Sequence, residues 1–252
     1  MKPESGKFLE ILQHTTDEEY RRYLKQRYRV LDSLIELNEN DRILDVGCGD
    51  GAVIKLLLDK KVKNIQIFAI DNSMEVLEKA KNNFSNYRSI IKFIKADICS
   101  LPFPNDHFNE TICFHVIEHL KPNKLIEALK ELNRVTQQEL FLGFPNKYSL
   151  LRVWEILSKE GIKGIINKTT NFLRKDRPLV IESPKYSDSP HVYYSASHMN
   201  KILKPFNFSL SVIKKVYFPI KFLDISQKGF SIPFGHSVII KLIKKKNGSE
   251  SL

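Results

Sequence analysis

The chain has 252 residues, of which 42% are hydrophobic, and its formal net charge is +11. The length suits one large α/β domain or a domain with an insertion, and the hydrophobic content excludes a wholly disordered chain. The basic balance favours anionic partners such as nucleic acid, phosphorylated substrates or membrane surfaces, although a lysine-rich solvated surface explains it as well.

Local sequence features bear on metal sites, disulfides and cellular location. The three cysteines are scattered and form no C-x-x-C pair, so neither a zinc site nor a disulfide framework is indicated. Residues 1–12 lack the apolar core of a signal peptide, and no run reaches the roughly 18 apolar residues of a membrane span. We therefore expect a cytoplasmic protein.

Helical spacing of apolar residues runs from Asp17 to Leu37, with acidic residues at the start. Asn38 to Asp41 are expected to end this helix. We treat residues 1–41 as an N-terminal helical cap. It either covers a ligand cleft or packs on the edge of a sheet.

A glycine-rich loop follows the first predicted strand, within the segment from Arg42 to Ala52, RILDVGCGDGA. The apolar run at its start reads as a buried strand, and Val53 to Leu58 reads as a helix. A strand, a glycine loop and a helix N-terminus together suit a nucleotide-like ligand, because the backbone can approach the ligand closely. Gly47, Gly49 and Ala52 also fit the dinucleotide fingerprint G-x-G-x-x-G/A, which leaves NAD as an alternative ligand.

The second predicted strand, Ile65 to Ile70, ends in Asp71. A carboxylate at this position can accept hydrogen bonds from both hydroxyls of a ribose. The alternative is a helix cap, since Asn72 and Ser73 begin the next predicted helix.

The third predicted strand, Ile90 to Lys95, leads into Ala96-Asp97 and Leu101-Pro102-Phe103. With the D-x-G-x-G-x-G order from Asp45 to Gly51, this segment resembles the class I S-adenosylmethionine-dependent methyltransferases. The match is to the small-molecule type known as methyltransferase domain 11. The resemblance implies that S-adenosylmethionine is the cofactor. It also implies a set of cofactor-binding positions: Asp45, Gly47, Cys48, Gly49, Gly51, Asp71, Asn72, Asp97, Ile98 and His115.

The fourth predicted strand, Thr111 to Val116, is followed by Ile117-Glu118-His119-Leu120. Its carboxyl end, Phe114 and His115, should border the transferred methyl group, because open α/β sheets bind ligands there. No Asp/Asn-Pro-Pro-Tyr/Phe or Pro-Cys motif is present in the sequence, which argues against DNA as the acceptor.

Three histidines are candidate general bases, because an imidazole titrates near neutral pH: His115, His119 and His191. Each could equally be a structural histidine. The spacing H-x-x-E-H also resembles the E-x-x-E-H of metal-assisted methyltransferases, with Glu118 and His119 as ligands. The first position of that motif is His115 here rather than Glu, so we expect no metal.

The rest of the chain fits the same family pattern. Pro122 to Val135 is a predicted helix and Glu139 to Phe144 the fifth strand. His191 to Phe208 resembles the segment before the family's last helix. Ser195 or Ser197 can cap that helix, and the closing antiparallel strands are Leu210–Phe218 and His236–Ile243.

Residues 147–190 are additional to this pattern. Apolar residues at helical spacing, among them Trp154, suggest a helical insertion above the cleft. It would act as a substrate lid, rest on a membrane surface or simply pack on the domain.

The sequence therefore predicts a Rossmann-like α/β fold, with a seven-stranded, mainly parallel sheet, flanking helices and a helical lid. Residues 42–252 would form the methyltransferase domain. The expected function is methyl transfer from S-adenosylmethionine to a small-molecule acceptor. An RNA methyltransferase and a non-catalytic cofactor-binding subunit are the alternatives. The acceptor atom and the oligomeric state are left open.

Overall fold

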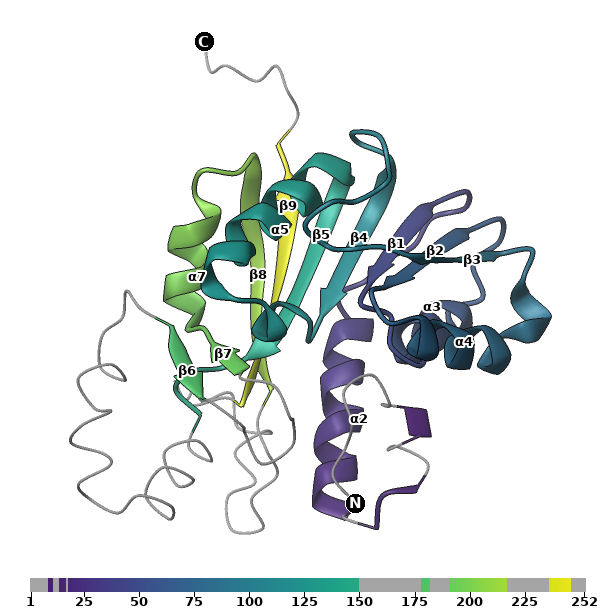
Figure 1. Cartoon of the computed structure of the whole chain (residues 1–252), viewed down its shortest axis with the longest axis horizontal. Coiled ribbons are helices and arrows are strands. Elements are labelled where there is room, and N and C mark those ends of the chain that lie inside the picture. Colours follow the sequence, from purple (N-terminus) through teal and green to yellow (C-terminus); the bar gives the residue numbers. More distant parts are fainter. Residues whose placement is uncertain are drawn as a thin grey trace.

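A computed structural model describes residues 9–10, 14–16, 18–149, 178–181, 191–216 and 236–245. Its centre is a seven-stranded sheet with the strand order β3-β2-β1-β4-β5-β9-β8 (Figure 1). The pairs among β1 to β5 are parallel, whereas β9 runs antiparallel to both β5 and β8. The predicted Rossmann-like fold is thus confirmed.

The strands of this sheet follow the expected order along the chain. They are β1 (Arg42–Val46), β2 (Gln66–Asp71), β3 (Ile91–Lys95), β4 (Phe108–Phe114), β5 (Thr136–Pro145), β8 (Phe208–Val216) and β9 (Ser237–Lys244). The described helices are α2 (Glu18–Asp32), α3 (Ala52–Asp59), α4 (Met74–Asn83), α5 (Pro122–Val135) and α7 (Ala196–Leu203), with short 3-10 turns η1 (Ser85–Tyr87) and η2 (Ile117–His119).

Two hydrophobic cores lie on the two faces of the sheet, because successive strand residues point to opposite faces. On one face, Leu44 and Val46 of β1 pack with the apolar sides of α5 and α7. On the other face, Ile43 packs with residues of α2, α3 and α4. The interior strands are buried on both faces, which explains their nearly continuous apolar runs.

The ends of three predicted elements, the leading helix and the fourth and fifth strands, differ from the structure. The leading helix ends at Asp32, five residues before Leu37, although Leu34 and Ile35 are buried as expected. Ser33 Oγ donates to the Val30 carbonyl at 2.8 Å, and the amide of Leu34 donates to Leu31, so a turn replaces the helix. Such a local side-chain bond competes with helix continuation.

The fourth strand begins at Phe108 and ends at Phe114, so its predicted end at Val116 is wrong. His115 has a φ of 60°, a left-handed backbone conformation that cannot continue a strand. The fifth strand begins three residues early, at Thr136, which pairs with Phe108. The starts of both strands were not predicted, because they lie before the continuous apolar runs.

Of the additional segment 147–190, the structure describes residues 147–149 and 178–181. Trp154 and the predicted helical residues lie outside the described residues. Leu179–Ile181 form β6, a strand that was not predicted, which pairs antiparallel with β7 (His191–Tyr193) in a separate small sheet. Whether the segment is a lid stays a prediction.

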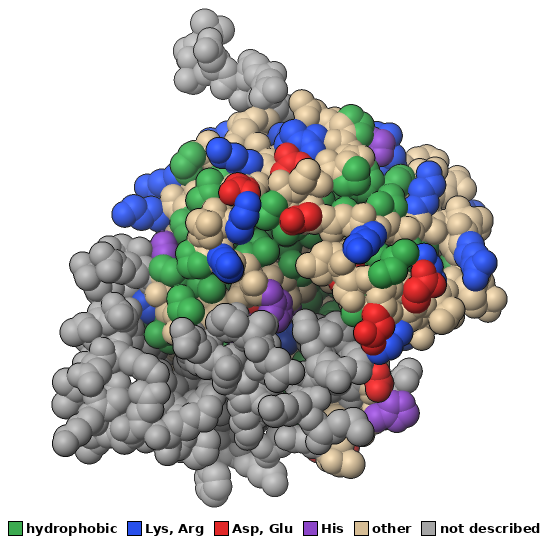
Figure 2. All heavy atoms as spheres, in the orientation of Figure 1, with side chains coloured by type: hydrophobic (Ala, Val, Ile, Leu, Met, Phe, Trp, Pro, Cys, Tyr) green, Lys and Arg blue, Asp and Glu red, His purple; other side chains and the backbone are tan. Residues whose placement is uncertain are grey.

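The described surface is mixed in character. On the face shown in Figure 2, lysine and arginine side chains are scattered among acidic ones, with hydrophobic side chains between them. Among the described helices, none is long and apolar enough to cross a membrane.

Candidate functional site

The glycine loop turns sharply between β1 and α3, and two of its glycines are required by their surroundings. Gly47 has a φ of 67°, and a Cβ there would lie 2.4 Å from Cγ2 of Val116. Gly51 has a φ of 97°, and a Cβ there would lie 2.2 Å from the ring of Phe84. A side chain at either position would be strained in its backbone and would clash. The loop is therefore held close to neighbouring elements.

A cavity opens at the carboxyl ends of β1, β2 and β4, beside this loop. The N-terminus of α3 borders the cavity, and no side chain caps it. Its backbone N–H groups suit a carboxylate or another anion. The residues that line the cavity are Tyr28, Val46, Gly47, Cys48, Gly49, Ala52, Val53, Ile70, Asp71, Asn72, Ala96, Asp97, Ile98, Phe114, His115, Val116, His119 and Leu120.

The structure thus brings together eight of the ten expected cofactor-binding positions around one cavity. Asp45 and Gly51 are the exceptions and do not line it. Asp45 is 1% exposed, and burial, followed by the charge of Asp71, raises its pKa to about 8. Cofactor binding by the eight lining residues stays a prediction.

Asp71 joins the glycine loop to the next helix. Its Oδ2 accepts from the amide of Gly49 at 3.2 Å, and its Oδ1 accepts from the amide of Ser73 at 3.0 Å. Ser73 is in turn the N-cap of α4. Asp71 is therefore not the helix cap itself but holds the amide of the cap residue. Because each carboxylate oxygen can accept two hydrogen bonds, Asp71 keeps capacity for a ribose diol.

Asp97 forms a tight turn at the edge of the same cavity. Its Oδ1 accepts from the amide of Cys99 at 2.8 Å, and its carbonyl accepts from the amide of Ser100. The side chain is exposed, and one oxygen remains for a ligand. Ile98, the next residue, supplies an apolar wall suited to a flat ring.

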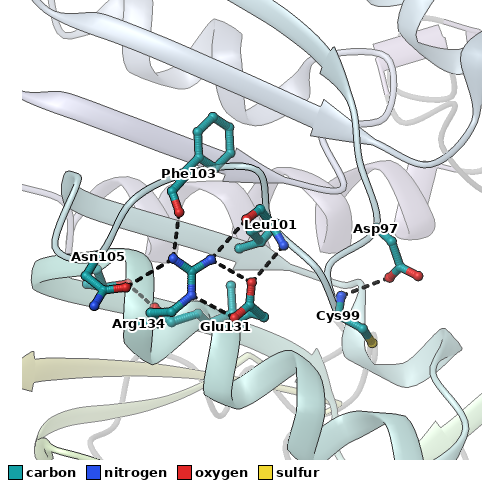
Figure 3. A network of polar contacts seen from close by, with 9 residues as sticks. Asp97, Cys99, Leu101, Phe103, Asn105, Glu131 and Arg134 are labelled. Carbon is teal, nitrogen blue, oxygen red and sulfur yellow. Dashed lines mark hydrogen bonds and ion pairs between the residues drawn. The ribbon is translucent and has the colours of Figure 1, made fainter.

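A clamp from α5 fixes the segment that follows Asp97, and sequence reasoning missed it (Figure 3). Arg134 donates to the carbonyls of Phe103 at 2.6 Å and Leu101 at 2.9 Å. Nε and Nη2, on one edge of the guanidinium, also donate to the two carboxylate oxygens of Glu131, at 2.7 Å each. Glu131 Oε2 in turn accepts from the amide of Leu101 at 2.8 Å. Only the i, i+3 spacing of Glu131 and Arg134 could have hinted at the ion pair. Its target in a distant loop has no sequence signal.

A second missed contact ties the start of the described chain to the glycine loop. Asp50 is 3% exposed, and its Oδ2 accepts from the amides of Leu9 at 2.6 Å and Glu10 at 3.1 Å. The carbonyl of Asp50 accepts from Nδ2 of Asn83 in α4 at 3.0 Å. The loop is thus held on two sides by residues far away in the sequence.

The leading helix, expected either to cover a ligand cleft or to pack on the sheet edge, contributes Tyr28 to the cavity wall. The ring centroid of Tyr28 lies 5.3 Å from that of Phe114. The guanidinium of Arg27 is buried against three rings, 5.4 Å from Tyr23, 6.0 Å from Tyr28 and 5.5 Å from Phe114. Such cation–π contacts stabilise a buried charge.

His115 directly follows β4, lines the cavity and contacts Glu118, three residues later. His115 Nδ1 and Glu118 Oε1 lie 2.8 Å apart, and both side chains are buried. Burial, followed by the charge of Arg27, lowers the pKa of His115 well below its usual range. Burial acts to raise the pKa of Glu118, but the contact with His115 outweighs burial and lowers it. At neutral pH the pair is therefore a neutral imidazole that donates to a carboxylate.

The other two candidate histidines meet at the edge of the cavity. His119 lines it, and the ring of His191 stands edge-on to His119 with centroids 4.5 Å apart. Strand β7, which carries His191, packs against η2. Across the described residues, no three or more His, Cys, Asp or Glu side chains are grouped so as to hold a metal ion.

Comparison with known proteins supports a family assignment. Residues 43–139 match the family model described as methyltransferase domain. An uncharacterized methyltransferase of Schizosaccharomyces pombe is 33% identical over 108 residues, which are 40% of this chain and 38% of that protein. A malonyl-[acyl-carrier protein] O-methyltransferase of a Paenibacillus species is 30% identical over 128 residues, 46% of this chain and 45% of that protein. The chain thus spans less than two thirds of the length of these curated relatives.

The fold has solved counterparts as well. The crystal structure of the PH0226 protein from Pyrococcus horikoshii superposes with a TM-score of 0.61 at 19% identity, covering 91% of this chain and 93% of that one. At this level of identity the likeness concerns the fold. Together with the sheet order, the glycine loop and the matched segment, it supports the presence of a class I S-adenosylmethionine-dependent methyltransferase domain in this chain.

Proposed function

We propose that the chain transfers the methyl group of S-adenosylmethionine to a small-molecule acceptor. The observation that carries this proposal is the single cavity that joins the glycine loop to the wall of His115 and His119. A cofactor held at the loop would present its reactive end toward polar side chains at the end of β4. Methyl transfer needs mainly orientation and the exclusion of water at such a place.

The residues around the cavity fit the three chemical parts of this cofactor. The uncapped N-terminus of α3 suits the amino-acid carboxylate, and the carboxylate of Asp71 suits the ribose hydroxyls. Asp97 and Ile98 suit the amino group and the ring of adenine. When bound, the cofactor supplies an electrophilic methyl group on a sulfonium, and the protein supplies the orientation.

A small acceptor is favoured over RNA by the form of the site. The cavity wall includes the buried side chains of Phe114 and His115 and the half-buried ring of Tyr28, so the space near β4 suits a compact molecule. On the face shown in Figure 2, basic side chains do not gather into a band. The net charge of +11 still favours an RNA acceptor, which keeps that alternative open.

Calorimetry with S-adenosylmethionine, its demethylated product S-adenosylhomocysteine, and NAD tests the cofactor. We expect binding of the two sulfur compounds and not of NAD. NAD binding without either sulfur compound would contradict the proposal.

Incubation of cell extract with cofactor carrying an isotopic methyl label tests the acceptor. We expect label in the metabolite fraction, at a rate nearly flat between low and moderate salt. Label in RNA, with a rate that falls steeply as salt rises, would favour the RNA alternative, because phosphate contacts release counterions.

A further inference from the structure

The pair of His115 and Glu118 has the geometry of an oriented base. His115 takes a left-handed backbone conformation, with φ of 60°, that places its imidazole between the cavity and η2. Nδ1 faces Glu118 Oε1 at 2.8 Å. Nε2 is buried and has no hydrogen-bond partner in the part of the chain that the structure describes. A buried polar atom without a partner costs about 1–3 kcal/mol, so an unmet atom at a cavity wall points to a ligand.

Several charged or titratable groups face the pair from the elements packed around it. Arg27 approaches from α2, His119 belongs to η2, and Tyr194 follows β7. Burial, and after it the charge of Glu118, raises the pKa of Tyr194 above its usual range, so that hydroxyl stays protonated. Arg27 and His119 both disfavour a protonated His115. The imidazole therefore carries one proton, on Nδ1, and presents a lone pair on Nε2.

We infer that His115 is the general base of the proposed methyl transfer, that Glu118 positions it, and that the acceptor is a hydroxyl group. This inference rests on the proposed function. As the acceptor O–H bond breaks, its proton passes to Nε2 and its electron pair stays on oxygen. That oxygen forms the new O–C bond to the methyl carbon, while the S–C bond breaks and its pair stays on sulfur. The proton leaves His115 for solvent after the products separate.

A carboxylate acceptor fits this wall poorly. It is already ionised at neutral pH and needs no base, and it would meet the buried negative charge of Glu118. A hydroxyl instead gives Nε2 the donor that it lacks.

The stability of the methylated product to alkali distinguishes a carboxylate acceptor from a hydroxyl acceptor before the acceptor molecule is identified. Extract is incubated with cofactor carrying a tritiated methyl group, and the labelled metabolites are treated with mild alkali. Methyl esters release volatile methanol, whereas methyl ethers keep the label. We expect an alkali-stable label. Release of the label as methanol would overturn the inference and leave the proposed methyl transfer intact.

Substitution of His115 tests its role as the base. His115→Asn keeps a residue that tolerates the left-handed backbone but offers no basic nitrogen. At saturating cofactor we expect a loss of roughly 100-fold or more in rate, the usual range for general base catalysis. His107→Asn, which alters a histidine packed on Phe68 and Phe103 away from the cavity, is the matched control. Parental activity of His115→Asn would overturn the inference.

Nitrogen-15 NMR of the histidines gives a readout that needs no acceptor. In protein with bound S-adenosylhomocysteine, the resonances absent from His115→Asn should report a neutral ring at pH 7 with its proton on Nδ1. In Glu118→Gln, we expect a mixture of both tautomers, because a neutral amide no longer favours Nδ1–H. A doubly protonated His115 or a proton on Nε2 in the parent would overturn the inference. Failure to bind S-adenosylhomocysteine at all would instead overturn the proposed function.

Discussion

Asp71 shows how one side chain can serve structure and ligand at once. Its two oxygens already bind the amides of Gly49 and Ser73, so the carboxylate fixes the loop that a cofactor would contact. The same oxygens retain lone pairs toward the cavity. A loss of this residue therefore removes a ligand contact and loosens the glycine loop.

We expect Asp71→Ala to weaken binding of S-adenosylhomocysteine by about 1.5–3 kcal/mol, the usual range for hydrogen bonds to a charged group. Calorimetry measures this change directly. Asp59→Ala is the control, since Asp59 is an exposed aspartate on α3 paired with Lys55. Unchanged affinity of Asp71→Ala would show that Asp71 serves only its structural hydrogen bonds to Gly49 and Ser73.

At the scale of elements, the clamp of Glu131 and Arg134 on α5 sets the position of the segment that carries Asp97. Lysine at 134 would keep the charge but lose the planar fork that reaches two carbonyls and both oxygens of Glu131. We expect Arg134→Lys to weaken binding of S-adenosylhomocysteine by about three- to tenfold, with far-UV circular dichroism unchanged.

Arg88→Lys alters an exposed arginine and is the matched control. If both variants bind equally well, the clamp serves stability rather than the cavity. In that case the only effect of Arg134→Lys would be a lower melting temperature.

Two acidic side chains lie next to each other on β4 and β5, toward the strand ends opposite the cavity. Glu110 and Glu139 face each other across the two strands, and Lys241 contacts Glu139 at 2.9 Å. Burial, and after it the charges of Glu139 and Asp41, raises the pKa of Glu110 from 4.5 to about 8. Because the folded value lies above the unfolded one, the contribution of Glu110 is fully present below pH 4.5. It is lost as the pH rises through about 8.

We therefore expect Glu110→Gln to raise the melting temperature at pH 9 by about 2–6 °C and to change it little at pH 4. Thermal unfolding followed by circular dichroism across this pH range measures both values. Glu127→Gln, at an exposed pair with Lys124, should leave the profile unchanged. Asp45 has a similarly raised pKa, so part of the slope should persist in Glu110→Gln. If the melting temperatures of parent and variant fall equally between pH 4 and pH 9, the assignment to Glu110 is wrong.

For the whole molecule, the sequence predicted the seven-stranded, mainly parallel sheet and eight of the residues that line the cavity, because both are marked by local patterns. Apolar runs ending in Gly47, Asp71 and Asp97 mark carboxyl ends of parallel strands, which meet at one edge. The clamp of Arg134 and the contact of Asp50 with Leu9 were missed, since they join residues without a common periodicity. The end of β4 was predicted wrongly because no sequence pattern indicates that His115 adopts a left-handed backbone conformation.

The whole sheet depends on β9, which is the last described strand and lies between β5 and β8. A chain that ends at His236 would leave β5 and β8 without this partner and expose apolar residues such as Ile240. We expect such a chain to show no cooperative thermal transition. A chain that ends at Lys245 keeps every described strand and should unfold cooperatively. Cooperative unfolding of the shorter chain would contradict this dependence.

The same placement of β9 has a consequence for synthesis on the ribosome. Strands β1 to β5 emerge first, and β5 then presents an open edge while the next hundred or so residues are still being made. An unpaired hydrophobic edge invites pairing with other chains. The nascent chain should therefore bind chaperones until translation reaches β9, and slower growth at low temperature should increase its soluble yield.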